Sequence, residues 1–129
     1  MELKQIGVIR TRFKSLDEAP RQGSVSEEEG ELIIFEEYEE GLRGIEKFEY
    51  LILLYWMHLS NRNVLFVKER NRGVFATRSP NRPNPIGFCV VKLIDVKGNV
   101  LRVRGVDAID GTPLIDIKPY YPEIDCVKT

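Results

Sequence analysis

Hydrophobic and polar residues alternate over several short stretches of the chain, which is the pattern of half-buried β-strands. Strands are predicted at residues 4–12, 31–38, 49–59, 64–67, 88–96 and 100–106. The stretch 49–59 is apolar on both faces and rich in aromatic residues, so we expect a central strand there. Gly98 marks a hairpin between the last two strands. Residues 42–48 are expected to hold a short helical turn.

Many short strands separated by turns, with few helical stretches, predict a mainly β fold built as an antiparallel barrel or sandwich. The length of 129 residues fits one domain, which we expect to span residues 1–129. The chain contains neither the Gly-x-Gly-x-x-Gly pattern of dinucleotide-binding folds nor the Gly-x-x-x-x-Gly-Lys pattern of phosphate-binding loops. A doubly wound parallel sheet is therefore not expected.

The stretch 72–87 shows neither helical nor strand periodicity and is expected to form a stiff, extended loop. Its prolines are Pro80, Pro83 and Pro85. Each fixes φ and removes an N–H donor, and each restricts the residue before it. Its arginines are Arg72, Arg78 and Arg82, whose guanidinium groups suit carboxylates and phosphates. A long loop in a small domain is usually functional, although a stiff surface turn with solvated arginines fits these residues equally well.

The stretch 107–121 carries three aspartates, and its residues Asp110 to Pro113 are typical of a turn. Asp116 lies among apolar residues, which is consistent with a side chain that points inward. The spacing does not match a calcium-binding EF-hand loop, and turn chemistry explains Asp107 and Asp110 as well as metal binding does. We therefore expect no metal site.

Charge is distributed unevenly along the chain, although the formal net charge is only −1. Residues 62–82 contain six basic residues against one glutamate, and residues 27–49 contain ten glutamates against two basic residues. This asymmetry would focus an anionic partner on the basic side. Two solvated faces that complement each other across a dimer explain the same pattern.

No apolar run is long enough to span a bilayer, and the first residues lack the apolar core of a signal peptide. The two cysteines, Cys89 and Cys126, do not form a metal-binding spacing. These features fit a protein of the reducing cytoplasm without membrane contact.

Two long motifs, at residues 73–87 and 110–120, resemble those of the TsaA-like family, which is also called TrmO. Weaker support comes from residues 6–9, from residues 20–22 and from the aromatic-rich strand that ends at His58. The similarity runs over nearly the whole chain and keeps the order of the family motifs.

The resemblance implies a dimeric methyltransferase that depends on S-adenosylmethionine and is built on a single antiparallel β-barrel. It implies a transfer RNA substrate, methylated on N6 of the threonylcarbamoyl-adenosine beside the anticodon. The cofactor contacts that it implies are Pro20, Arg21, Gln22, His58, Leu59, Arg78, Phe88, Asp107, Ala108, Ile109 and Asp110.

Removal of a proton from the weakly nucleophilic carbamoylated nitrogen would help the reaction, so a proton acceptor is expected near the substrate. Asp116, Asp110 and His58 are the candidates, and the residues do not rank them. Arg72, Arg82 and Lys118 are predicted to contact tRNA. Two other interpretations stay open, namely a binding module for the cofactor or RNA without chemistry, and a metal-dependent hydrolase that uses the aspartates.

Overall fold

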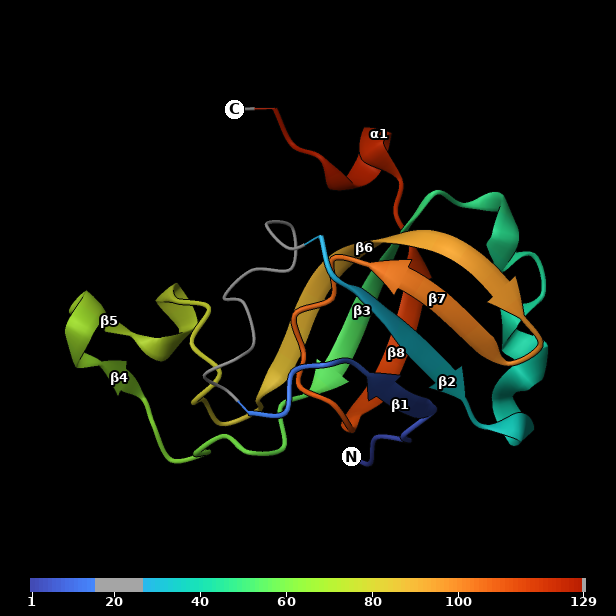
Figure 1. The fold of residues 1–129 in the computed structure, drawn as a ribbon. Helices are drawn as coiled ribbons and strands as arrows, with labels where there is room; N and C mark the ends of the chain where they lie inside the picture. Colours follow the sequence, from blue (N-terminus) through green and yellow to red (C-terminus); the bar gives the residue numbers. More distant parts are fainter. Residues whose placement is uncertain (16–26, 129) are drawn as a thin grey trace.

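The computed structural model describes residues 1–15 and 27–128 of the chain, and in these residues six strands close into an antiparallel barrel (Figure 1). The barrel strands are β1 (Gly7–Arg10), β2 (Glu29–Ile34), β3 (Tyr50–Trp56), β6 (Ile86–Lys97), β7 (Val100–Arg104) and β8 (Thr112–Pro119). They follow the order β1-β2-β7-β6-β3-β8, and β8 pairs again with β1. The prediction of a mainly β, antiparallel barrel is therefore confirmed.

The barrel core is built from the residues that alternate inward along each strand. Ile9, Leu32, Leu53, Leu101 and Leu114 come from five different strands, and all are fully buried. Because successive side chains of a strand point to opposite faces, one apolar row per strand is enough to fill the interior. The alternation read from the sequence therefore corresponds to the inner and outer walls of the barrel.

Two segments differ from the sequence-based prediction. Only a turn at residues 110–113 was predicted in the region of β8, but the backbone of β8 pairs with both β1 and β3. The stretch 72–87 was expected to be a loop throughout. Instead, β5 (Arg72–Gly73) pairs with β4 (Phe66–Val67), the 3-10 helix η5 (Val74–Ala76) follows, and residues 86–87 already belong to β6.

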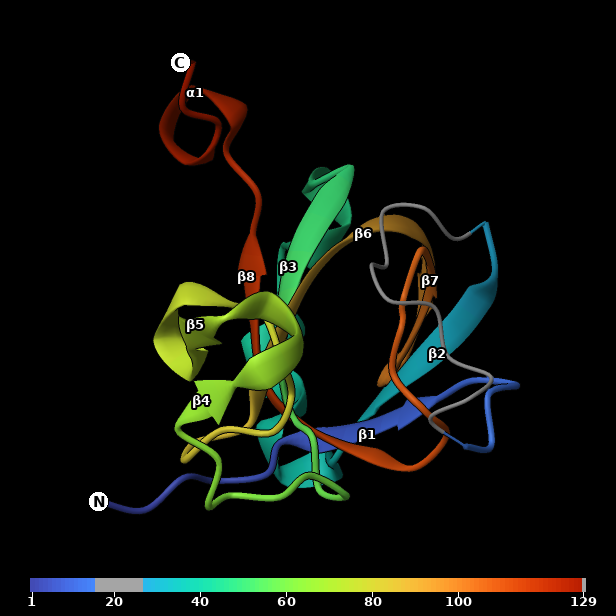
Figure 2. The same cartoon turned by 90° about the vertical axis from the view of Figure 1, so that its left-hand side faces the viewer.

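Short elements project from opposite sides of the barrel (Figures 1 and 2). On one side lies an extension, called the arm below, formed by residues 64–76 with β4, η4 (Lys68–Arg70), β5 and η5. The other side carries the 3-10 helices η2 (Glu36–Leu42) and η3 (Ile45–Lys47), close to the helical turn expected at residues 42–48. The helix α1 (Pro122–Asp125) follows β8. No helix in the described residues is long and apolar enough to cross a membrane.

Candidate cofactor-binding and active site

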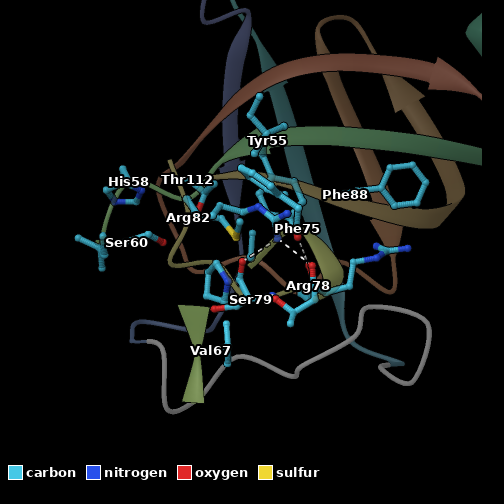
Figure 3. A pocket seen from close by; sticks show the side chains of 18 of the residues that line it. Tyr55, His58, Ser60, Val67, Phe75, Arg78, Ser79, Arg82, Phe88 and Thr112 are labelled. Atoms are coloured by element: carbon cyan, nitrogen blue, oxygen red, sulfur yellow. Dashed lines mark hydrogen bonds between the residues drawn. The ribbon is translucent and has the colours of Figure 1, made fainter. Parts of the chain in front are cut away.

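A large pocket lies between the arm and the adjacent end of the barrel (Figure 3). Its volume is about 1360 Å³. The walls come from four parts of the chain that are far apart in sequence: the end of β3, the arm with the loop after it, the start of β6 and the segment after β7. Closure of the barrel brings these parts to one end of the molecule.

Most of the predicted cofactor contacts line this one pocket. His58 and Leu59 lie after β3, Arg78 lies in the loop after the arm, and Phe88 lies on β6. Asp107, Ala108 and Ile109 complete the set from the segment after β7. His58 and Ser60 lie on one side of the pocket and Arg78 and Phe88 on the other, with Arg82 between them (Figure 3). Residues predicted from separate motifs are therefore gathered in space.

The loop after the arm is held in shape by arginine side chains. One guanidinium nitrogen of Arg82 donates hydrogen bonds of 3.0 Å to the carbonyl oxygens of both Thr77 and Ser79. The partly buried Arg82 thus braces the loop from inside. It also lines the pocket, and the sequence analysis predicted that it contacts tRNA. These bonds give Arg82 a structural role that the sequence did not suggest.

A second arginine, Arg62, connects the same loop to the barrel. Its Nε donates a hydrogen bond of 2.8 Å to the carbonyl oxygen of Pro83. The guanidinium group lies 5.0 Å from the ring centre of Trp56, the last residue of β3. The position of the loop is therefore fixed by a stacked pair that bridges it to the barrel wall.

Arg78 differs from these two structural arginines. Its guanidinium group lies over the ring of Phe88, 5.4 Å from the ring centre, and no hydrogen bond links it to any other described residue. The side chain is exposed in the pocket. The braced loop thus presents a cation beside an aromatic face, which suits an anionic group next to a flat ring.

Asp107 lies in the irregular segment between β7 and β8. Gly105 has a positive φ of 97°, and Val106 behind it is fully buried. The hydroxyl of Tyr55 donates a hydrogen bond to Oδ1 of Asp107. The thiol of Cys89 lies against both residues. Burial, reinforced by neighbouring groups that include this carboxylate, raises the pKa of the Tyr55 hydroxyl and of the Cys89 thiol, so both stay protonated.

Asp110 is engaged with the N-terminal segment. Its carboxylate accepts hydrogen bonds from the backbone N–H of Thr11 at 3.1 Å and from Nζ of Lys14 at 3.0 Å, and Arg10 lies 3.6 Å away. Partial burial acts to raise the pKa of Asp110, but these partners outweigh it and hold the pKa below its usual value. Asp110 lies next to the pocket-lining residue Ile109 without lining the pocket itself, and it fixes residues 11–14.

The structure does not bring Asp116 and Lys118 to the same site. The two side chains form an ion pair of 3.1 Å on β8. Asp116 lines a second pocket of about 360 Å³ together with η2 and η3, on the opposite side of the barrel from the arm. Its side chain is 43% exposed, so the inward orientation inferred from its apolar neighbours is wrong. A strand bulge at the β3–β8 pairing interrupts the simple alternation on which that inference depended.

Three predicted cofactor contacts, Pro20, Arg21 and Gln22, lie outside the described residues. Within the described part of the chain, no group of three or more histidine, cysteine or acidic side chains is arranged to hold a metal ion.

Sequence reasoning missed Tyr55, Phe75, Ser79 and Thr112 as pocket residues. A polar tyrosine in the otherwise aliphatic inward row of β3 was the available signal for Tyr55.

The fold and the site show the class to which this protein belongs: an antiparallel β-barrel with a pocket at one end of the barrel. The model of the tRNA-methyltransferase O N-terminal domain matches residues 8–126, and the chain therefore belongs to the TrmO family. A crystal structure of TrmO from Pseudomonas aeruginosa superposes with a TM-score of 0.84 at 36% identity, covering 98% of this chain and 57% of that one.

Two curated relatives differ in name and in length. The S-adenosyl-L-methionine-binding protein of Archaeoglobus fulgidus is 53% identical over 132 residues, covering 99% of this chain and 95% of the relative. The tRNA (adenine(37)-N6)-methyltransferase of Escherichia coli is 38% identical, covering 94% of this chain but 58% of that enzyme. The chain thus spans little more than half the length of the Escherichia coli enzyme and of the superposed crystal structure.

Proposed function

We propose that this protein is an S-adenosylmethionine-dependent methyltransferase that acts on N6 of threonylcarbamoyl-adenosine beside the anticodon of tRNA. The observation that carries the proposal is the convergence of the predicted cofactor contacts on a single pocket. The family and the names of its relatives support the same assignment. Such a protein would work in the cytoplasm, where tRNA is modified.

The described residues fit the three chemical parts of the cofactor. Phe88 and Leu59 offer apolar surface for the adenine ring. The guanidinium of Arg78 is suited to the carboxylate of the methionine part, and the carboxylate of Asp107 to its ammonium group. When bound, the cofactor supplies an electrophilic methyl group. The pocket exceeds the roughly 300–1,000 Å³ of common small-molecule sites, which leaves room for a nucleobase as well.

His58 is the candidate proton acceptor that the geometry favours. It lines the pocket, whereas Asp110 is held by Thr11 and Lys14 and Asp116 lies in the second pocket. An imidazole can accept a proton near neutral pH. We propose that His58 takes the proton from the substrate nitrogen and returns it to solvent, while the rest of the pocket orients the reactants.

The arm supplies the cations that would receive tRNA. Arg72 on β5 lines the pocket and is exposed, and Lys68 and Arg70 are exposed on η4 beside it. We propose that these side chains bind tRNA phosphates and guide the modified base into the pocket. Lys118, which was predicted to share this role, lies on β8 in an ion pair with Asp116. We therefore propose that its contact with tRNA is separate from the one made by the arm.

The proposal includes a homodimer in which the arm of one copy packs on a second copy. A two-stranded sheet alone is marginally stable in water, and β4 pairs with β5 over only two residue pairs. The arm also exposes large apolar side chains, because Leu65, Phe66 and Phe75 are 66%, 52% and 78% exposed. Light scattering should give twice the chain mass, and Phe75→Ser should shift it toward the monomer.

The decisive experiment combines calorimetry with a methyl-transfer assay. Titration of the folded, ligand-free protein with S-adenosylmethionine should give stoichiometric binding. Labelled cofactor and tRNA that carries threonylcarbamoyl-adenosine should then yield the methylated nucleoside, and tRNA without this modification should not. Binding without transfer would instead support a cofactor-binding module, consistent with the name of the Archaeoglobus relative. Loss of an activity on chelation would support the metal-dependent hydrolase.

A further inference from the structure

The inward rows of β3 and β6 become polar where they reach the pocket. On β3 the row runs Leu51, Leu53 and Tyr55, and on the paired β6 the facing row runs Val91, Cys89 and Gly87. Tyr55 and Cys89 are each only 5% exposed. Their hydroxyl and thiol groups therefore lie at the end of the barrel core, where it meets the pocket.

The ring of Tyr55 occupies space that exists because residue 87 is a glycine. The two residues are direct partners in the β3–β6 register. A Cβ atom added at Gly87 would lie 2.2 Å from Cε2 and 2.5 Å from Cζ of the tyrosine ring. Real Cβ atoms do not make such contacts, so any larger residue at 87 would displace the ring. Gly87 therefore leaves the ring of Tyr55 the space to reach toward the segment after β7.

That direction leads to Asp107. The Tyr55 hydroxyl donates to Oδ1 of Asp107, and both residues line the pocket. Phenylalanine would fill the same apolar volume without this bond, so the hydroxyl has a purpose other than packing. The Cys89 thiol lies beside the pair. Tyr55 of β3 and Cys89 of β6 are therefore the titratable groups of these two strands that contact the carboxylate of Asp107.

We propose that Tyr55, seated over Gly87, is a positioning residue that aims the Asp107 carboxylate into the pocket for a cationic group of the ligand. The proposal rests on the proposed function, in which that group is the ammonium of S-adenosylmethionine. A carboxylate whose first oxygen is held by a buried donor has its second oxygen directed in advance. Tyr55 thereby lowers the entropy that Asp107 loses when the ligand binds.

Tyr55→Phe in the full chain tests the proposal by calorimetry with S-adenosylmethionine. We expect the Kd to rise about tenfold, the usual effect of losing a hydrogen bond to a charged group. The matched control is Tyr50→Phe on the same strand, 41% exposed, which should leave the Kd unchanged.

A double-mutant cycle separates positioning from general damage. In an Asp107→Asn background, Tyr55→Phe should change the Kd less than twofold, since the residue acts through the carboxylate. Gly87→Ala approaches the same contact from β6 and should weaken binding as Tyr55→Phe does, which keeps the test available if one variant does not fold. Equal affinity of wild type and Tyr55→Phe, or additive effects in the cycle, would overturn the proposal. Absence of binding by folded wild type would overturn the proposed function itself.

Discussion

The two ends of the barrel each carry a pocket with an aspartate at its wall, but they are built differently. At the arm end, Asp107 lines a pocket formed by four parts of the chain, whose walls also include the braced loop with Arg78. At the other end, Asp116 lies in a smaller pocket beside the acidic helices η2 and η3. One strand joins the two, because Thr112 of β8 lines the first pocket and Asp116 the second. Four residues of extended chain, about 13 Å, separate the two sites. A residue that lies close in sequence to a site residue, as Asp116 lies close to Thr112, therefore need not belong to the same site.

The largest expected effect comes from the proton acceptor. His58→Asn should lower kcat for tRNA methylation about 100-fold, because loss of a general base typically has an effect of at least this size. Cofactor binding should weaken by less than tenfold, since other groups hold the ligand. Asp116→Asn, at the opposite end, should leave kcat within about twofold, and single-turnover kinetics would measure both. A larger loss of kcat for Asp116→Asn than for His58→Asn would mean that the proton acceptor lies at the η2 end of the barrel and not at the arm end.

Replacement of Arg78 should have the next largest effect. Arg78→Ala should raise the Kd for S-adenosylmethionine roughly 10-fold to 100-fold, as expected for a charged hydrogen bond to the ligand. The control is Arg43→Ala, which removes an exposed arginine at the η2 end that pairs with Glu40. Calorimetry on both variants would give the difference. Equal affinities would mean that Arg78 does not bind the cofactor.

Arg82→Ala should act through the loop that it braces. Loss of the bonds to Thr77 and Ser79 should lower the Tm by about 2–8 °C and weaken cofactor binding severalfold. Lysine should not restore either property, because it lacks the planar fork of arginine. Arg72→Ala, by contrast, should keep the Tm and lower the salt slope of tRNA binding by about one. If Arg82→Ala changes only the salt slope, the sequence-based assignment to tRNA is correct.

The smallest expected effect concerns pH and Asp110. Its lowered pKa means that ionised Asp110 stabilises the folded state above the ordinary value of about 3.9, and that this stabilisation is lost as pH falls through the folded pKa. Asp110→Asn should therefore lower the free energy of unfolding by about 1 kcal/mol at pH 7, with a difference that shrinks below about pH 4. Urea titrations at both pH values would measure it. The exposed Glu46, which forms no ion pair with other described residues, serves as the control through Glu46→Gln.

Much of the fold was predictable because inward and outward residues alternate with a period of two. The hairpin at Gly98 and the apolar strand β3 both follow from local patterns. The strand β8 was missed because Pro113 and Pro119 at its ends resemble loop residues, and its pairing with β1 and β3 depends on contacts distant in sequence. The pairing of Arg72 and Gly73 with β4 was hidden for the same reason.

Motifs in the sequence indicated some of the residues that line the pocket, among them Arg78 and Asp107. Local sequence could not show that Arg82 braces its own loop whereas Arg78 does not, so we predicted a ligand contact for both, the cofactor for Arg78 and tRNA for Arg82. Nor could it place Asp116, whose side of the barrel depends on a bulge. The role inferred for Tyr55 needed the register with Gly87, which only the folded barrel supplies.

The stacked pair of Arg62 and Trp56 has a practical consequence, because the chain contains a single tryptophan. Its tryptophan emission therefore comes from one place, the point at which the loop after the arm is anchored to the end of β3. A movement of that loop on ligand binding would change the environment of this indole, and no other indole contributes a background. Stopped-flow emission can therefore follow the loop during ligand binding without an added label.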